Sequence, residues 1–473
     1  MKNYRMLIGG VLFAGATSMD VINPATEEVI ASCPCANASQ LHDAVMAAQS
    51  AFPAWSKRPL AERSQLLMKL AGSLVARQEE LARLLTAEQG RPLPGSIFEV
   101  LGSAAIIQYF ASQQLCETVL RESELEKVVR QHMPLGVVAA ITAWNFPLLL
   151  LATKIAPALI AGNTVVAKPA PTTPLTTLLF GELCAEVLPA GVINIIAGRD
   201  DLGGLLTSHP DVAKVAFTGS TPTGKRVMAN ASTSLKRLTL ELGGNDAAIV
   251  LDDADPAAVA QSLFAGAMLN SGQLCIATKR VYVHESLYDA VCEELAKCAA
   301  HSVVDDGMIE GAQIGPVQNK RQYDRLLGYL EEARQRGRIV AGGSPLERKG
   351  YFIPPTIVRD LPDDARLVTE EQFGPILPVL RYSNVNDAIR RANDSELGLG
   401  GTVWGKDLDR AYAVASQLQS GSVFVNKNPE LQPDLPLGGA KQSGMGCELG
   451  REGLEEYTQS KIVSLAKRAP ASA

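Results

Sequence analysis

The sequence predicts an α/β fold in which helices cover parallel, doubly wound sheets. After residue 136, helical stretches alternate with short β-branched runs at 137–142, 164–167, 192–196 and 212–217. A second alternation extends from about 247 to 425, with helices expected at 255–268, 287–300, 321–336 and 385–392. Strands separated by helices pair in parallel through crossover connections. Because 473 residues exceed what one core usually supports, the two alternations indicate two domains.

The part of the chain before this region is predicted to be mainly helical. Ser39 can cap a helix that extends to Ala51, and apolar residues keep a helical period through 60–90. A further apolar helix is expected at about 97–116. Near the N-terminus, we expect residues 7–10 to pair with 21–24 as a hairpin.

Two segments are predicted to form a peripheral ribbon. The charged segment 117–131 interrupts the first domain, and 457–464 is strand-like. Exposed strands of this kind pair with the edge of another subunit, so we expect a homodimer or a homotetramer. The expected boundaries are a first domain at 1–113 and 134–242, a second domain at 243–445, and an oligomerisation hairpin and tail at 114–133 and 446–473.

Composition favours a small-molecule partner. The net charge is −6 and the basic residues are scattered, so neither nucleic acid nor a membrane is an expected partner. The eight cysteines include no C-x-x-C pair, which favours reduced thiols and a cytoplasmic location, and we expect no metal site. Residues 2–16 imitate a short signal peptide, but their expected place in a hairpin argues against export. No run is expected to reach transmembrane length, since prolines and Lys154 break the apolar stretch 146–167.

Three residues in separate motifs carry groups suited to one reaction. Cys275 lies in Asn-Ser-Gly-Gln-Leu-Cys, Glu241 in Leu-Glu-Leu-Gly-Gly, and Asn145 in Trp-Asn-Phe-Pro. A thiol can attack a carbonyl carbon, a side-chain amide can stabilise the resulting oxyanion, and a carboxylate can activate water. The bland alternatives are a buried inert thiol, a strand-end carboxylate and a turn asparagine.

A glycine-containing turn at 217–225 follows one strand and opens a helix. Free N–H groups and the positive end of a helix dipole can hold a pyrophosphate there. The turn is not G-x-G-x-x-G, so an ordinary turn remains the alternative. Lys168 ends another strand and can donate to ribose hydroxyls, although a solvated lysine is the commoner case. The convergence of these two strand ends is the deciding condition.

Taken together, the motifs resemble the aldehyde dehydrogenase superfamily over nearly the whole chain. Eight stretches carry the resemblance in order: 23–26, 143–147, 162–169, 217–220, 240–244, 272–275, 370–375 and 438–444. The resemblance implies a Rossmann-like dinucleotide-binding first domain, a catalytic second domain and a small β oligomerisation ribbon.

The resemblance also implies roles for four catalytic residues. Cys275 would be the nucleophile that forms a thiohemiacetal with the aldehyde and, after hydride transfer, a thioester. Asn145 and the backbone N–H of Cys275 would hold the oxyanion. Glu241 would activate the water that releases a carboxylic acid, and Lys154 would support proton transfer from this base. Relatives that acylate coenzyme A generally lack a glutamate at this place.

The implied cofactor is NAD, with NADP possible. Its implied contacts are Lys168 at the adenosine ribose, Gly219 and Ser220 at the pyrophosphate, Glu371 at the nicotinamide ribose, and Phe373, Trp144 and Leu242 nearby. Many NAD-preferring relatives carry a glutamate three residues after this lysine, where this chain has Pro171. No arginine of the segment replaces it, so NAD stays the first choice.

Other departures concern the substrate. Thr153 stands where many relatives have tryptophan, and Leu437 stands in place of phenylalanine. The expected pocket residues are Phe146, Leu149, Thr153, Leu274, Ile276 and Leu437. They predict an apolar tunnel for medium-chain aliphatic or aromatic aldehydes, with plain core packing as the alternative. The effects of Cys447, in place of an arginine, and Leu397, in place of a tyrosine, stay open.

Two other functions remain as alternatives. One is a catalytically idle dinucleotide-binding or structural protein on the same scaffold, which the retained thiol, amide and carboxylate disfavour. The other is coenzyme A-acylating dehydrogenation of a semialdehyde, which Glu241 disfavours.

Overall fold

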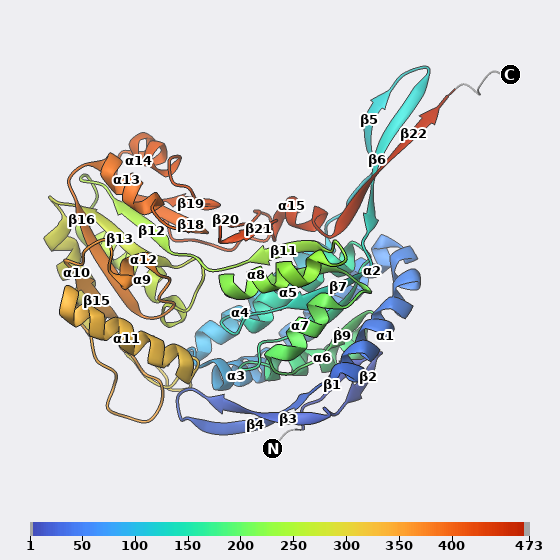
Figure 1. Cartoon of the computed structure of the whole chain (residues 1–473), viewed down its shortest axis with the longest axis horizontal. Helices are drawn as coiled ribbons and strands as arrows, with labels where there is room; N and C mark the ends of the chain where they lie inside the picture. Colours follow the sequence, from blue (N-terminus) through green and yellow to red (C-terminus); the bar gives the residue numbers. More distant parts are fainter. Residues whose placement is uncertain (1–2, 468–473) are drawn as a thin grey trace.

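The computed structural model describes residues 3–467. Two large sheets, each covered by helices, form the body, and a three-stranded ribbon projects from it at upper right in Figure 1. This architecture confirms the predicted α/β fold class.

The first sheet has eight strands in the order β2-β1-β9-β8-β7-β10-β11-β21. The five strands from β9 to β11 are parallel, and the other three extend the sheet antiparallel. Their bounds are Met6–Ile8 (β1), Val11–Phe13 (β2), Val137–Ile141 (β7), Thr164–Lys168 (β8), Ile193–Ile195 (β9), Val212–Thr218 (β10), Arg237–Glu241 (β11) and Gly444–Met445 (β21).

Helices pack on both faces of this sheet. One group is α1 (Ala38–Lys57), α7 (Asp200–Ser208) and α8 (Thr221–Ser232). The other group begins with α5 (Pro147–Ile160) and α6 (Leu175–Val187), and α2 (Leu60–Ala76), α3 (Gln78–Gln89) and α4 (Leu93–Ala111) pack against these. The strands between them are buried on both faces, which is why they read as continuous β-branched runs.

The second sheet has seven strands in the order β14-β15-β16-β13-β12-β18-β19, all parallel except β14. In β12, Ala247 and Ile249 join one apolar cluster and Ala248 and Val250 the other, because alternate side chains point to opposite faces. The strand bounds are Asp246–Val250 (β12), Thr278–His284 (β13), Arg338–Ala341 (β14), Thr356–Arg359 (β15), Ile376–Tyr382 (β16), Gly400–Trp404 (β18) and Ser422–Val425 (β19).

The helices of this half confirm the four predicted ones, each to within one residue. They are α9 (Pro256–Met268), α10 (Tyr288–His301), α11 (Lys320–Arg336) and α13 (Val385–Asn393). Two shorter helices, α12 (Arg366–Thr369) and α14 (Leu408–Ala415), complete the set.

The projecting ribbon pairs β5 (Thr118–Glu122), β6 (Glu126–Pro134) and β22 (Thr458–Ala466) antiparallel. Apolar side chains such as Val119, Leu120, Ile462 and Leu465 are exposed on it. The smaller elements are the pair β3 (Thr17–Asn23) and β4 (Glu28–Cys35), the pair β17 (Leu397–Gly398) and β20 (Ala440–Lys441), the 3-10 turn η1 (Leu269–Gly272) and α15 (Gly450–Glu455).

The N-terminal pairing that we expected is wrong. Residues 7–10 do not pair with 21–24: β1 turns back on β2 through Gly9 and Gly10, and β3 pairs with β4. Both glycines have positive φ, 61° and 84°, which suits a two-residue hairpin turn.

Two helix predictions need correction. Helix α1 begins after Asn37 rather than at Ser39, because the Asn37 side chain accepts from Gln40 N and the Gln40 side chain accepts in return. It ends at Lys57, beyond the predicted Ala51, and α4 begins before 97 and ends before 116.

Helix α4 also departs from the expectation that no run reaches transmembrane length. Within residues 3–467 it is the one helix long and apolar enough to cross a membrane, judged by length and composition alone. It buries Ser96, Glu99 and Ser103 and packs against α2, α3 and α5, which are the contacts of a core helix.

Candidate active site

The thiol of Cys275 lies on a tight turn that joins η1 to β13. Asn270, Ser271 and Gly272 all have positive φ, at 51°, 57° and 70°, which is strained for the two non-glycine residues. Hydrogen bonds hold the turn: Ser271 Oγ donates to Gly315 O at 2.9 Å, and Lys279 Nζ donates to Gly272 O at 2.6 Å. Such strain persists where the surroundings over-determine it, so this turn presents its thiol in a fixed direction.

Burial keeps this thiol protonated. Burial raises the pKa of Cys275 to about 12, and the carboxylates of Glu241, Glu371 and Asp246 add to the effect. The nearby Lys279 ammonium acts in the opposite direction. The sulfur therefore needs a base before it can attack, because the thiolate is the nucleophile.

Asn145 lies against the same turn. Its Nδ2 donates to Gln273 O at 3.1 Å, and its backbone carbonyl accepts from Asn270 Nδ2 at 3.1 Å. Asn145 Oδ1 is buried without a hydrogen-bond partner among the described residues. The Asn145 side-chain amide thus contacts Gln273, which is two residues before Cys275 in the sequence. The oxyanion hypothesis requires such proximity.

A buried ion pair that sequence reasoning missed positions Asn145. Arg91 and Glu99 are joined at 2.6 Å with both side chains almost fully buried. Arg91 also donates to the Asn145 carbonyl and lies over the Phe146 ring. Glu99 Oε1 accepts from the backbone N–H groups of Leu148 and Leu149 at the start of α5. The pair therefore fixes the backbone on both sides of Phe146.

Glu241 ends β11 with its carboxylate buried. Its Oε1 has no hydrogen-bond partner among residues 3–467. Burial raises the pKa of this carboxyl well above its usual range, the Glu448 carboxylate raises it further, and Lys154 lowers it. An acid that is buried, close to a thiol and without a partner is suited to taking and giving protons.

Lys154 lies beside this acid, bonded to a second carboxylate that the sequence analysis did not select. Its Nζ donates to Glu448 Oε1 at 2.5 Å and to Thr218 Oγ1 at 2.6 Å. Thr153 Oγ1 donates to the other oxygen of Glu448 at 2.7 Å. Glu448 falls in the segment 446–473 that we assigned to the tail. The only feature of the sequence that could have indicated it is that it is a single acidic residue after a glycine-rich run.

The expected cofactor residues converge at one edge of the first sheet. Lys168 and Phe217 lie on either side of Ile141 in register, and Thr218 lies opposite Glu241. The carboxyl ends of β7, β8, β10 and β11 therefore meet, which fulfils the condition that we set for a dinucleotide site.

Local geometry at this edge fits phosphate and ribose. Gly219 and Ser220 join β10 to α8, where first-turn N–H groups face outward. A Cβ at Gly224 would lie 2.6 Å from a methyl group of Leu242, so glycine lets this helix pack closely there. Lys168 is buried, and the one hydrogen bond of its ammonium in the described chain is a long contact of 3.5 Å to Pro169 O. Its ammonium is thus available to a ligand.

Glu371 and Phe373 approach from the second half of the chain. Glu371 Oε1 accepts from Gly244 N at 3.0 Å, and a Cβ at Gly243 would lie 2.4 Å from Glu371 Oε2. The Phe373 ring meets Trp144 edge-on at 5.3 Å. These contacts place Glu371 next to the loop that follows Glu241, and Phe373 next to the segment that carries Asn145.

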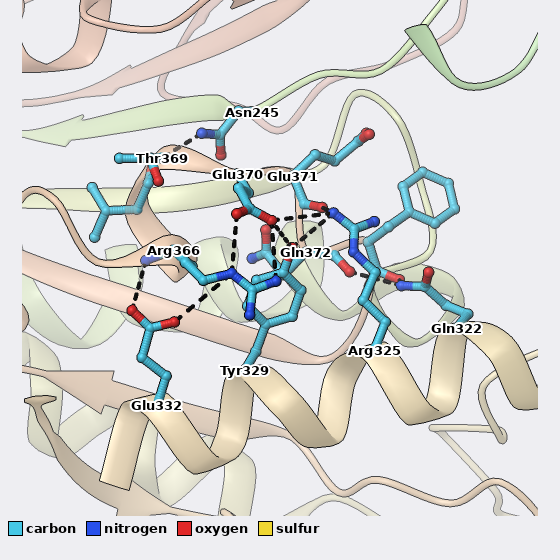
Figure 2. A network of polar contacts seen from close by, with 12 residues as sticks. Asn245, Gln322, Arg325, Tyr329, Glu332, Arg366, Thr369, Glu370, Glu371 and Gln372 are labelled. Atoms are coloured by element: carbon cyan, nitrogen blue, oxygen red, sulfur yellow. Dashed lines mark hydrogen bonds and ion pairs between the residues drawn. The ribbon is translucent and has the colours of Figure 1, made fainter. Parts of the chain in front are cut away.

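Helix α11 tethers the segment that carries them (Figure 2). Arg325 donates to Glu371 O at 3.0 Å, and Gln322 donates to Gln372 O and Phe373 O at 2.8 and 3.0 Å. Tyr329 and Arg366 bind the neighbouring Glu370 carboxylate. Because Glu370 faces this network, Glu371 faces the opposite way.

The expected substrate residues are not all alike in their surroundings. Phe146, Leu149 and Leu274 are buried in the apolar cluster against which Cys275 packs, and Leu437 is half-buried beside it. Ile276 faces Gly400 of the second sheet, where a Cβ would lie 2.8 Å from it. The Thr153 hydroxyl donates a hydrogen bond to Glu448, so Thr153 does more than replace a larger side chain in the wall of the expected tunnel.

In the part of the chain that the structure describes, no group of three or more His, Cys, Asp or Glu side chains could hold a metal ion.

Comparisons with known proteins point to one family. The sequence model of the Aldehyde dehydrogenase family matches residues 13–463, which confirms the resemblance. Phenylacetaldehyde dehydrogenase of Pseudomonas fluorescens is 39% identical over 98% of this chain and 96% of the relative. The NAD+ complex of an aldehyde dehydrogenase from Bacillus cereus is 36% identical with a TM-score of 0.96, covering 98% of this chain and 97% of that one. An NADP-dependent enzyme of E. coli is 35% identical with the same TM-score and 98% of both chains covered.

Proposed function

The chain belongs to the aldehyde dehydrogenase family, and we propose that it oxidises an apolar aldehyde to the carboxylic acid with NAD or NADP as oxidant. One observation carries the proposal most directly: a buried carboxylate without a hydrogen-bond partner at Oε1, Glu241, lies within electrostatic reach of the Cys275 thiol.

The first step needs a base because the thiol is neutral. Glu241 takes the thiol proton, and the sulfur forms a bond to the aldehyde carbon while the carbonyl electron pair moves to oxygen. The side-chain amide of Asn145 and the backbone N–H of Cys275 donate to this oxygen. Losing one such donor costs about 3–4 kcal/mol in the barrier.

NAD(P), when bound, supplies the acceptor for the hydride that leaves the tetrahedral carbon. The residues that would hold it are Lys168 at the adenosine ribose, Gly219 and Ser220 at the pyrophosphate, and Glu371 at the nicotinamide ribose. The fit rests on the available Lys168 ammonium and on the open helix start at Ser220. Trp144, Leu242 and Phe373 would pack beside it.

Hydrolysis of the thioester then uses Glu241 again. Glu241 first passes the thiol proton on toward Lys154 and Glu448, which are next in line because Lys154 Nζ donates to Glu448 Oε1 at 2.5 Å. Its carboxylate then takes a proton from water, the water oxygen attacks the acyl carbon, and the Cys275 sulfur leaves as a thiolate and regains a proton from Glu241. A carboxylate in this place favours the free acid over transfer to coenzyme A.

The preferred cofactor is NAD. Pro171 offers no carboxylate to repel a 2′-phosphate, so NADP remains open to the site. For the substrate, the apolar side chains of Phe146, Leu149, Leu274 and Leu437 belong to or pack beside the cluster that Cys275 contacts, which suits medium-chain aliphatic or aromatic aldehydes.

A panel of aldehydes, each tested with NAD and NADP, examines the proposal. Cofactor reduction is followed by absorbance in wild type, Cys275→Ala and Glu241→Gln. We expect turnover with apolar aldehydes, none in Cys275→Ala, and unchanged NAD binding in that variant. Binding of NAD without turnover of any aldehyde would support the idle scaffold instead. Activity that requires coenzyme A and survives Glu241→Ala would support the acylating reaction.

The ribbon of β5, β6 and β22 supports a homodimer or a homotetramer. Its exposed apolar side chains and its free strand edges suit pairing with another subunit. Light scattering after size-exclusion chromatography measures the assembly, and a monomer at micromolar concentration would contradict this part.

A further inference from the structure

The loop 169–174 leads from Lys168 at the end of β8 to the start of α6, so it borders the proposed adenosine site. Its internal support is slight. A backbone hydrogen bond from Thr173 N to Ala170 O, at 3.3 Å, closes a turn within it. The side-chain hydroxyls of Thr172 and Thr173 are buried without a hydrogen-bond partner among the described residues. The loop therefore depends on neighbouring elements for its position.

Two residues from distant parts of the sequence hold this loop. Glu88, near the end of α3, accepts with its carboxyl oxygens from Leu175 N at 2.7 Å and from Thr176 N at 2.9 Å. Gln318 Nε2 donates to Thr172 O at 3.2 Å and to Glu88 O at 3.1 Å. The carboxyl group thus holds the far end of the loop, and the Gln318 amide joins its middle to α3.

The backbone of Gln318 is bound to the turn that carries the nucleophile. Gln318 N donates to Gln273 Oε1 at 2.8 Å. Gln273 Nε2 donates to Asn270 O at 3.1 Å and to Pro316 O at 3.4 Å. Gln273 O accepts from Asn145 Nδ2. Both glutamines are buried, and a buried amide whose donors and acceptors are bonded keeps one orientation. Gln318 therefore contacts the loop with its side chain and the nucleophile turn with its backbone.

The main chain before Gln318 packs closely on both sides. A Cβ at Gly315 would lie 2.2 Å from Gly90 O, so the segment 315–318 lies directly on the end of α3. From the other side, Ser271 Oγ of the nucleophile turn donates to Gly315 O at 2.9 Å. The segment that carries Gln318 thus has little room to shift relative to either neighbour.

We propose that Gln318 is a positioning residue that holds the loop 169–174 for the adenosine half of the cofactor and anchors this loop to the nucleophile turn through Gln273. The inference rests on the proposed function, since it needs Lys168 to meet the adenosine ribose. A loop that is held in place before the ligand arrives loses less conformational freedom on binding, so its support increases affinity. Gln318 acts through the loop and needs no contact with the cofactor.

Gln318→Leu tests the side chain. The variant removes the donors to Thr172 O and Glu88 O but keeps the backbone N–H that meets Gln273. The dissociation constants of NAD and of ADP-ribose, measured by calorimetry, should each rise about tenfold, because the loop must then be ordered on binding. The KM for NAD should rise with them, while kcat at saturating NAD stays within about twofold of wild type.

A merely structural role of Gln318 gives a different result. Buried carbonyls that lose their donor lower stability, so the melting temperature of Gln318→Leu should fall in either case. A lower melting temperature with a wild-type dissociation constant for ADP-ribose would overturn the proposal. So would a loss of kcat at saturating NAD without a change in ADP-ribose affinity.

Gln318→Asn is the second variant and carries the test if the leucine variant does not fold. It keeps an amide on a side chain too short to reach both carbonyls, so ADP-ribose should again bind more weakly. Gln335→Leu is the matched control, since Gln335 is exposed on α11 and its side chain donates to Glu331. Its affinity should equal that of wild type. Equal affinity for ADP-ribose in Gln318→Asn and Gln335→Leu would contradict the role of Gln318.

Gln273→Leu tests the other end of the link. It removes the bonds to Asn270 O and Pro316 O in and beside the nucleophile turn, but it leaves the Gln318 side chain on the loop. We expect kcat to fall about tenfold or more, because the thiol and the Asn145 amide lose their support, while ADP-ribose binds nearly as in wild type. A loss of ADP-ribose affinity equal to that of Gln318→Leu, with unchanged kcat, would overturn the proposed division of roles.

Binding measurements separate this inference from the proposed function, because ADP-ribose binds without an aldehyde and without hydride transfer. Wild-type protein that binds ADP-ribose but oxidises no aldehyde would refute the proposed oxidation, and the affinities of the variants would still decide the role of Gln318. If wild type oxidises aldehydes and both Gln318 variants bind ADP-ribose as tightly as it does, only the role of Gln318 fails. If wild type binds neither NAD nor ADP-ribose, both fail.

Discussion

Replacing Arg91 with methionine should damage both stability and catalysis. The substitution removes the ion pair with Glu99 and the bond to the Asn145 carbonyl, while a side chain of similar length remains. Breaking a buried ion pair on one side costs about 3–5 kcal/mol, because the other charge stays buried and unpaired. The Asn145 amide would also lose its support, and misplacement by about 1 Å can reduce kcat by roughly 100-fold.

Urea unfolding followed by tryptophan fluorescence, together with kcat and KM, measures these effects. The double variant Arg91→Met/Glu99→Gln should be less destabilised than Arg91→Met, because the amide oxygen of glutamine still accepts from Leu148 and Leu149 without an unpaired charge. Arg83→Met is the control, since Arg83 is exposed and its pair with Glu79 is worth little. Unfolding at the wild-type urea concentration with a normal kcat would refute the reasoning.

The pH dependence of Arg91→Met follows from the same pair. Burial raises the pKa of Glu99 in the folded protein, and Arg91 opposes the rise. Without Arg91 the folded carboxyl prefers its proton more strongly. The protonated form is compatible with folding, so the variant should lose least stability at acidic pH and progressively more as pH rises through the folded pKa.

Three further predictions concern the thiol and its base. Glu241→Gln removes the base of both steps, so stopped-flow absorbance should show slower cofactor reduction in the first turnover and a steady state slower by about 100-fold or more; an unchanged steady state would remove this residue from hydrolysis. Glu448→Gln removes a carboxylate that raises the Glu241 pKa, so the acid limb of the pH–kcat profile should move to lower pH, and a move to higher pH would contradict the geometry. Glu371→Gln removes a carboxylate that raises the Cys275 pKa, so iodoacetamide should alkylate the thiol faster at fixed pH, whereas Glu370→Gln, which faces Tyr329, should not change the rate.

Much of the fold could be predicted because its signals are local. Buried parallel strands are β-branched runs, and the helices that cover the second sheet start and end where the apolar period does. The N-terminal pairing was predicted wrongly because a short apolar strand can pair with several neighbouring segments equally well. The tight turn at Gly9 and Gly10 selects β2 as the partner of β1. Helix α1 was placed late since Asn37 and Ser39 are both good caps and only the reciprocal bond of Gln40 distinguishes them.

The candidate site could be predicted only where a residue type is unusual for its place. Cys275, Glu241 and Asn145 stand in short motifs, so they were found. Glu448 and Arg91 were not, because an acid near the C-terminus or a basic residue before a helix normally indicates a solvated surface. Their burial arises from chain segments far apart in sequence: Glu448 meets Lys154, and Arg91 meets the Asn145 carbonyl.

The balance of buried charge explains how such a site can exist at all. Burial raises the pKa values of Glu241, Glu371 and Cys275, and it raises that of Asp246 to about 7. An isolated buried charge is expensive, so burial makes each of these groups hold a proton more tightly. In its ionised form Glu241 can take the proton of Cys275, and negative charge then moves from one buried group to another while the total stays constant. The enzyme that we propose therefore activates its nucleophile without adding negative charge to its interior, and a raised pKa of the sulfur is compatible with catalysis because the base beside it is raised in the same way.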